Sequence, residues 1–328
     1  MSAEVGKKAI DYLINHSGSR HNLEVDFFGG EPLMNLDVVK EIVDYARSRE
    51  KECDKEFNFT MTTNCVLLND KTNEWLNKEM VNVVLSIDGR KDIHDEVRKT
   101  PNGKGCYDII LNNAKKFRQI RGQKSYYVRG TFTAKNLDFA EDILALNDEG
   151  FDQISMEPVV TDIEDLAIKQ EHIPRILQEY ERLAVEYIDR RKSDKWFNFF
   201  HFMIDLQGGP CVIKRLTGCG SGCEYLSVVP HGNVYPCHQF AEKDEYLMGN
   251  VFDNTLDLEV SKKFAKNIVT NKKQCGDCPA KYYCSGGCVA NNINYAGSME
   301  TPYDLSCQMM KKRLELSLAI SAIEGSQQ

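Results

Sequence analysis

The chain has 328 residues and a mass of 37.4 kDa, enough to bury one large core or two ordinary ones. Its formal net charge is −8, and acidic and basic residues are interspersed along it, so no basic stripe is available for nucleic acid. The sequence shows no secretion signal and no apolar run long enough to cross a bilayer. We therefore expect a cytoplasmic protein with no nucleic-acid or membrane partner.

The N-terminal half alternates strand-like and helix-like segments. Five strands are expected, over residues 22–30, 56–64, 81–89, 125–133 and 151–160, each followed by a helix. Further helices are expected over residues 3–17 and 171–192. The intervening helices carry apolar residues three to four positions apart: Val39, Ile42, Val43 and Ala46; Ile109, Ile110 and Phe117; Phe139, Ile143 and Leu146. This alternation predicts an α/β fold with a mainly parallel sheet.

Polar residues lie at the carboxyl ends of the expected strands. Such ends meet at one edge of a parallel sheet, where ligands commonly bind. The residues are Gly30, Glu31, Thr63, Asn64, Ser86, Asp88, Arg129 and Glu157.

The C-terminal half begins with a Gly-Gly-Pro turn near Gly208, which predicts domains over residues 1–207 and 208–328. A hairpin is expected from segments 225–229 and 234–238. The chain beyond it is turn-rich, so a metal core would have to supply cohesion there.

Cysteines change in density at this boundary. Nine of the twelve lie between Cys211 and Cys307, while Cys53, Cys65 and Cys106 stand without partners at ligand spacing and are interpreted as structural. Reducing conditions in the cytosol favour metal ligation over disulfides for such a cluster.

Four of these cysteines, Cys275, Cys278, Cys284 and Cys288, follow the spacing C-x2-C-x5-C-x3-C. A structural zinc site prefers paired C-x2-C knuckles and needs only four ligands. The second pair here is C-x3-C and the cysteines outnumber the needs of one zinc ion, so iron–sulfur chemistry is favoured.

The wider pattern resembles the SPASM domain of radical S-adenosylmethionine (SAM) enzymes that modify peptides. In this chain Cys219 is followed by twelve residues, Gly232, four residues and Cys237, and Cys307 closes the pattern. The resemblance implies two auxiliary [4Fe–4S] clusters. One would be held by Cys275, Cys278, Cys284 and Cys307, and the other by Cys219, Cys237 and Cys288 with Cys211 as the favoured fourth ligand. Cys223 or a substrate thiolate are the alternatives for that position.

The strand-end segments "DFFGGEPLMN", "TTN", "SIDGRKDIHDEVR" and "VRGTFT" are similar to the radical SAM barrel. The resemblance implies SAM binding through its ammonium, ribose hydroxyls and carboxylate, with Glu31, Ser86 and Arg129 respectively as the main partners. The full implied set is Gly29, Gly30, Glu31, Thr63, Asn64, Ser86, Asp88 and Arg129. Each residue also has a structural reading: Asp88 and Arg98 could brace a loop, His94 could anchor that loop, Met156 could belong to the core, and Glu157 could be a buried acceptor.

The C-x3-C-x2-C spacing of a radical cluster is absent from the sequence. We therefore expect an N-terminally truncated chain: a partial (β/α)6 radical SAM barrel lacking its first strand, followed by a SPASM domain. The radical [4Fe–4S] cluster would lie in the missing segment. On that expectation the polypeptide alone cleaves little or no SAM, and no catalytic residue is assigned.

The run "GGPCVIKRLTGCGSGCEYLSVVPHGNVYPCHQF" resembles maturases of SCIFF (six-cysteine) peptides. That likeness implies thioether crosslinks formed in a ribosomally made, cysteine-rich precursor peptide, with flavodoxin or ferredoxin as electron donor. Three alternatives stay open: an anaerobic sulfatase-maturating enzyme that forms formylglycine, a non-catalytic electron carrier or peptide-binding remnant, and a zinc-stabilised structural domain.

Overall fold

The structure is a computed structural model that describes residues 1–205 and 211–325. It divides into two compact units. The cysteine-rich unit comprises Met1–His21, Asp44–Lys55 and Ile204–Leu314, and the sheet unit comprises Asn22–Val43, Glu56–Met203 and Glu315–Gln328. The boundary expected at residues 207 and 208 lies outside the described residues, so two contiguous domains stay a prediction.

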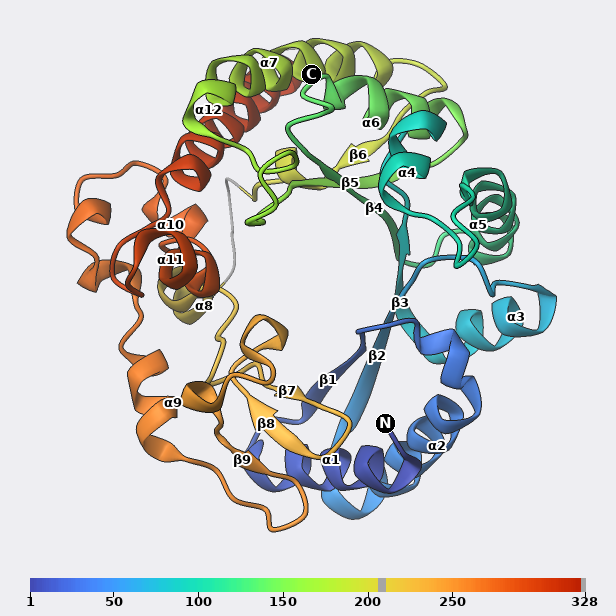
Figure 1. Ribbon diagram of the computed structural model, residues 1–328, viewed down its shortest axis with the longest axis vertical. Coiled ribbons are helices and arrows are strands. Elements are labelled where there is room, and N and C mark those ends of the chain that lie inside the picture. Colours follow the sequence, from blue (N-terminus) through green and yellow to red (C-terminus); the bar gives the residue numbers. More distant parts are fainter. Residues whose placement is uncertain (206–210, 326–328) are drawn as a thin grey trace. The chain divides into compact units, whose positions relative to one another are not determined.

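The sheet unit contains a six-stranded parallel sheet in the order β1-β2-β3-β4-β5-β6 (Figure 1). The strands are β1 (Asn22–Phe27), β2 (Glu56–Thr63), β3 (Met80–Ser86), β4 (Tyr126–Phe132), β5 (Gln153–Pro158) and β6 (Asn198–Phe199). The five expected strands and the α/β class are confirmed. The short β6 was not expected, because two residues carry no readable alternation.

Helices connect successive strands in the manner of right-handed crossovers between parallel neighbours. They are α2 (Leu36–Cys53), α3 (Asp70–Glu79), α4 (Lys91–Val97), α5 (Tyr107–Arg121), α6 (Phe139–Asp148) and α7 (Ile173–Arg190), with the 3₁₀ turns η1 (Pro32–Asn35), η2 (Gln170–His172) and η3 (Phe200–Phe202). Helices α3, α5 and α6 cover the same face of the sheet (Figure 1).

The buried faces of these helices follow the expected apolar spacing with one exception. Ile110 and Phe117 on α5 are fully buried, whereas Ile109 is 54% exposed. Neighbouring positions on a helix point about 100° apart, and on this helix Ile110 faces the core while Ile109 faces outward. The apolar pattern therefore included one residue that lies outside the buried face.

The cysteine-rich unit is built from short elements. Its helices are α1 (Ala3–His16), α8 (Val212–Thr217), α9 (Leu258–Ala265), α10 (Lys281–Cys284), α11 (Val289–Ala296) and the first part of α12 (Asp304–Gly325). Its 3₁₀ turns are η4 (His238–Phe240), η5 (Asp244–Tyr246), η6 (Val269–Asn271) and η7 (Lys273–Cys275). A small antiparallel sheet joins β7 (Ser227–Val228), β8 (Asn233–Tyr235) and β9 (Gly249–Asn250).

The expected hairpin is present, with Val228 opposite Val234. Gly232 has φ +93°, a left-handed backbone that favours glycine in the hairpin turn.

Two apolar clusters stabilise this unit without any metal. One packs Phe240 and Phe264 with their ring centroids 5.4 Å apart, and Tyr235 belongs to the same cluster. The other joins Val5 and Tyr12 of α1 to three buried residues around the small sheet. The expectation that a metal core supplies further cohesion beyond the hairpin stays a prediction.

Within the residues that the structure describes, no helix has the length and apolar character needed to span a membrane.

Candidate metal centres and strand-end site

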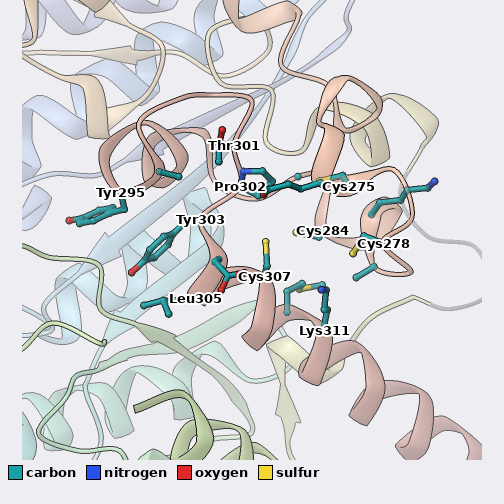
Figure 2. A pocket seen from close by; sticks show the side chains of 17 residues that line it. Cys275, Cys278, Cys284, Tyr295, Thr301, Pro302, Tyr303, Leu305, Cys307 and Lys311 are labelled. Atoms are coloured by element: carbon teal, nitrogen blue, oxygen red, sulfur yellow. The ribbon is translucent and has the colours of Figure 1, made fainter. Parts of the chain in front are cut away.

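Four cysteines from separate short segments gather around one cavity of the cysteine-rich unit. Cys275 ends η7, Cys278 lies in the following turn, Cys284 ends α10, and Cys307 lies in the first turn of α12. The cavity has a volume of about 650 Å³ (Figure 2). All twelve cysteines of the chain are free thiols. We call this group the four-cysteine site; it is the set expected to hold one auxiliary cluster.

The backbone after Cys284 is arranged to approach a sulfur ligand closely. Ser285, Gly286 and Gly287 all have left-handed backbones, with φ of +57°, +82° and +79°. Consecutive residues in this region point successive N–H groups inward, as in anion-binding nests. The N–H groups of Gly286 and Gly287 donate to the Cys284 sulfur, which favours its thiolate form.

Burial dominates the titration of these thiols in the protein without metal. It raises the pKa of Cys275 and of Cys284, and it raises that of Cys307 to about 11, with the neighbouring sulfurs adding to each increase. A metal would relieve this cost, because a coordinated sulfur is deprotonated and its charge is neutralised by the metal. Four thiols that line one cavity thus supply the number and kind of ligands that a [4Fe–4S] cluster or a four-thiolate metal ion takes.

Two lysines that the motif analysis did not single out also line this cavity, Lys281 and Lys311. Lys311 lies four residues after Cys307 on α12, so a helical reading of that segment places both on one face. Their positive charges favour anionic ligands in the cavity.

A second group contains Cys219, Cys237 and Cys288. Burial raises the pKa of Cys237, and the sulfurs of Cys288 and Cys219 add to this increase. The backbone N–H of Gln239 donates to the Cys237 sulfur, and the Ser221 hydroxyl donates to the carbonyl oxygen of Pro236 at 3.1 Å. These are the three ligands expected for the second cluster.

The fourth ligand of this group is not fixed by the contacts. The Cys223 sulfur lies 3.4 Å from the carbonyl oxygen of Ser261, and no cysteine is among the groups that shift its pKa. Cys219 and Cys223 nevertheless line the same cavity of about 130 Å³. Cys211 precedes α8 and is exposed. Cys211 therefore stays a prediction.

At the strand ends of the sheet unit, Glu31 organises two neighbouring loops. Its carboxylate accepts hydrogen bonds from the Thr63 hydroxyl at 2.8 Å, the Asn64 backbone N–H at 2.7 Å and the Leu33 backbone N–H at 3.1 Å. A carboxylate offers about four acceptor positions, so one is left for a ligand ammonium. Gly29 and Gly30 before it are exposed and have left-handed backbones.

Ser86 and Arg129 are register partners on β3 and β4, and Arg129 is exposed.

Asp88, in contrast, is buried and paired within the protein. Its carboxylate is buried, pairs with Arg98 at 2.5 Å and accepts a hydrogen bond from the Thr131 N–H at 3.0 Å. Asp88 thus braces the segment that carries Arg98, and its expected contact with SAM stays a prediction.

His94, Asp95 and Cys106 also lie within metal-ligand distance of one another. The Asp88 backbone N–H donates to His94 Nδ1 at 3.2 Å, so Nε2 carries the proton of the neutral ring and faces the Cys106 sulfur at 3.6 Å. Burial lowers the His94 pKa, which keeps the ring neutral. Asp95 accepts hydrogen bonds from the backbone N–H groups of Cys106 and Tyr107. A protonated nitrogen cannot ligate metal, so this group is a hydrogen-bonded brace.

Of the remaining residues considered, Met156 is fully buried in the core and Glu157 lies 3.3 Å from His201. Burial strongly raises the pKa of Cys65, whose sulfur accepts a hydrogen bond from the backbone of Ser86.

Family models match one region in the N-terminal half of the chain and one in the cysteine-rich half. A 4Fe-4S single cluster domain matches residues 1–111, and an iron-sulfur cluster-binding domain, SPASM, matches residues 219–279. The radical SAM cyclopropyl synthase TigE of Paramaledivibacter caminithermalis is 24% identical over 94% of this chain and 61% of its own length. The cysteine-type anaerobic sulfatase-maturating enzyme of Clostridium novyi is 25% identical over 92% of this chain and 82% of its own length.

Among solved structures, native anSMEcpe with bound AdoMet and Kp18Cys peptide superposes with a TM-score of 0.78 at 18% identity. The superposition covers 98% of this chain and 90% of that one. The chain is thus similar to radical SAM/SPASM enzymes, among them anaerobic sulfatase-maturating enzymes. The structural likeness shows the fold, a parallel sheet with a cysteine-rich region beside it in the sequence, and residues 219–279 match a domain that binds iron–sulfur clusters.

The N-terminal match changes one expectation. The 4Fe-4S single cluster domain covers residues 1–111. The comparisons therefore do not show that the chain is truncated, and they speak against the expectation that it lacks a radical-cluster domain. The cysteines inside that match are Cys53, Cys65 and Cys106, which do not have the C-x3-C-x2-C spacing. We therefore assign no ligands to a radical cluster.

Proposed function

We propose that the chain acts in a peptide maturase that forms thioether crosslinks in a ribosomally made, cysteine-rich peptide. The observation that carries this proposal is the four-cysteine site, in which Cys275, Cys278, Cys284 and Cys307 face one cavity. The likeness of its cysteine-rich sequence to maturases of six-cysteine peptides supports the substrate class.

The reaction requires an electron acceptor besides SAM. A C–H and an S–H bond break, a C–S bond forms, and two protons and two electrons leave the peptide. Bound SAM would supply the acceptor for one electron and one proton, which leave together as a hydrogen atom. The other proton would pass to water, and a cluster held by the cysteines would supply the acceptor for the other electron. Bound clusters and SAM supply this redox chemistry.

The residues of the chain would hold these groups in place. Glu31 and the carbonyls of Gly29 and Gly30 would bind the SAM ammonium, Ser86 the ribose and Arg129 the carboxylate, while Thr63 and Asn64 hold Glu31 in position. The second cysteine group would hold the other cluster, with Cys211 or a substrate thiolate completing it. A flavodoxin or ferredoxin would supply electrons.

Product analysis tests the proposal. The protein is purified and reconstituted without oxygen, then incubated with SAM, a reductant and either a six-cysteine precursor or a sulfatase peptide. We expect the precursor to lose two hydrogen atoms per crosslink while keeping its sulfur. Iron and sulfide analysis beforehand distinguishes clusters from zinc, because zinc without sulfide would rule out the cluster assignment.

A sulfatase-maturating activity is the second candidate, since the Clostridium novyi relative bears that name and aligns over most of its length. Its product would be a sulfatase peptide that has exchanged sulfur for oxygen. That product, without a crosslinked precursor, would overturn our preference.

A further inference from the structure

A buried lysine lies beside the four-cysteine site. Lys272 is 1% exposed and stands between η6 and η7. Its Nζ donates to the carbonyl of Met299 at 2.5 Å. The aliphatic stem crosses Gly286, where an added Cβ would lie 2.6 Å from the lysine Cε. Lysines are almost never fully buried unless they are paired, so this position calls for a nearby negative charge.

Anionic cluster ligands would supply that charge. In the metal-free protein burial lowers the pKa of Lys272, while the sulfurs of Cys275, Cys284 and Cys307, followed by the carboxylate of Glu300, act to raise it. The backbone carbonyl of Lys272 accepts the N–H of Cys275 at 2.9 Å, which fixes the lysine next to the first ligand. Protonated thiols would leave the ammonium poorly compensated, whereas thiolates around a cluster would compensate it.

A polar network holds this arrangement in place. Asn292 is buried and donates to the carbonyl of Gly286 at 3.0 Å and to that of Met299 at 3.5 Å. Its side-chain oxygen accepts the N–H of Tyr303 at 2.9 Å. The carbonyl that binds the Lys272 ammonium is therefore tied to the glycine turn after Cys284 and to the segment that leads into Cys307.

We propose that Lys272 is a buried cation that raises the reduction potential of the cluster held by Cys275, Cys278, Cys284 and Cys307. This inference rests on the clusters of the proposed function. Reduction adds an electron to a group that four thiolates already make anionic, and a fixed positive charge away from water favours the added electron. The N–H groups on the Cys284 sulfur act in the same direction. Lys272 thereby makes the cluster a better acceptor for the electron left over when a thioether forms.

The next residue provides a matched control. Lys273 carries the same formal charge but is exposed, so water screens it. The test is a redox titration of anaerobically purified, full-length protein, followed by electron paramagnetic resonance, with iron and sulfide measured for each variant. Lys272→Met keeps the length of the side chain over Gly286 and removes its charge, and Lys272→Arg keeps the charge.

We expect Lys272→Met to shift one of the two reduction waves to more negative potential and to leave the wave of the other cluster unchanged as an internal reference. Lys272→Arg and Lys273→Met should titrate close to the wild-type protein. Wild-type potentials in a fully loaded Lys272→Met protein, or an equal shift in Lys273→Met, would overturn the inference.

The iron content of the two Lys272 variants also tests the inference. If Lys272→Met loses one cluster and Lys272→Arg retains it, the charge is needed to hold the anionic group, which supports the inference. If both variants lose it, the side chain acts by shape alone and the inference fails. A wild-type protein without iron and sulfide would instead refute the proposed function itself.

Discussion

The strand-end site and the four-cysteine site differ in how their polar groups are satisfied. In the sheet unit, Glu31 and Asp88 already accept hydrogen bonds from neighbouring loops and strands, so the protein alone fixes their geometry. In the cysteine-rich unit, the thiols of Cys275, Cys284 and Cys307 surround a cavity and raise one another's pKa. One site is organised by its own contacts, and the other places its cysteines around a cavity, where a bound metal group would stabilise their thiolate forms.

Metal removal should therefore affect the two units unequally, and this is the largest effect we expect. After chelation, amide exchange should rise by orders of magnitude over residues 273–288, where short turns depend on the ligands. Strands β2 and β3 should keep their protection, since their core contains Phe57, Phe59 and Leu85, all essentially inaccessible. Hydrogen exchange read by mass spectrometry measures both regions in one sample. Equal loss of protection in both would contradict the comparison.

Substitutions of single cysteines test which of them hold a cluster in the cysteine-rich unit. Cys275→Ser should remove one cluster and lower the iron content by about half, because serine is a poor ligand for iron–sulfur clusters. Cys223→Ser is the matched variant, since its sulfur contacts Ser261 and is shifted by no other cysteine. Iron and sulfide per chain give the result. A loss of iron in Cys223→Ser would make Cys223 the fourth ligand in place of Cys211.

Sequence patterns predicted the five long strands and the residues at their ends, because alternation and strand–helix order are local signals. They did not predict β6, whose two residues pair with β5 only through the folded chain. Spacing also could not separate Ile109 from Ile110, which are adjacent on one helix but differ completely in burial.

The sequence also predicted part of the candidate metal site. Cysteine spacing alone singled out Cys275, Cys278, Cys284 and Cys288, and the resemblance to the SPASM domain replaced Cys288 with Cys307, the cysteine that lines the cavity with the first three. It could not distinguish Lys272 from Lys273, because two consecutive lysines look alike until the fold buries one of them. It also could not show that the carboxylate of Asp88 is taken up by Arg98.

In the sheet unit, Glu31→Ala tests how far the strand-end site is organised by the protein. The substitution leaves the Thr63 hydroxyl and the N–H groups of Asn64 and Leu33 without their acceptor, at a cost of about 1–3 kcal/mol. Glu31→Gln keeps one acceptor oxygen and should cost less. Denaturant unfolding of both variants measures the difference. Stability equal to wild type in Glu31→Ala would mean that a ligand, rather than these contacts, orders the loops.

The smallest effect concerns the ionisation of Cys307 in metal-free protein. Since burial raises its pKa from an ordinary value near 9.0 to about 11, the folded state prefers the thiol, and this contribution to stability is present below about pH 9. It is lost as the pH rises from about 9 to about 11. Alkylation by iodoacetamide, which requires the thiolate, should accordingly reach half its limiting rate near pH 11 at Cys307.

A peptide spanning residues 300–312 is the reference, because its thiol is exposed and should react at its ordinary, lower pH. Peptide mapping by mass spectrometry assigns the reaction to Cys307 in each case. In the metal-loaded protein the same cysteine should resist alkylation at every pH that keeps the cluster intact, since coordination to the metal lowers the nucleophilicity of the sulfur and burial restricts access to it. An identical midpoint in peptide and folded protein would mean that the Cys307 thiol is not desolvated, and that this site needs no metal to satisfy it.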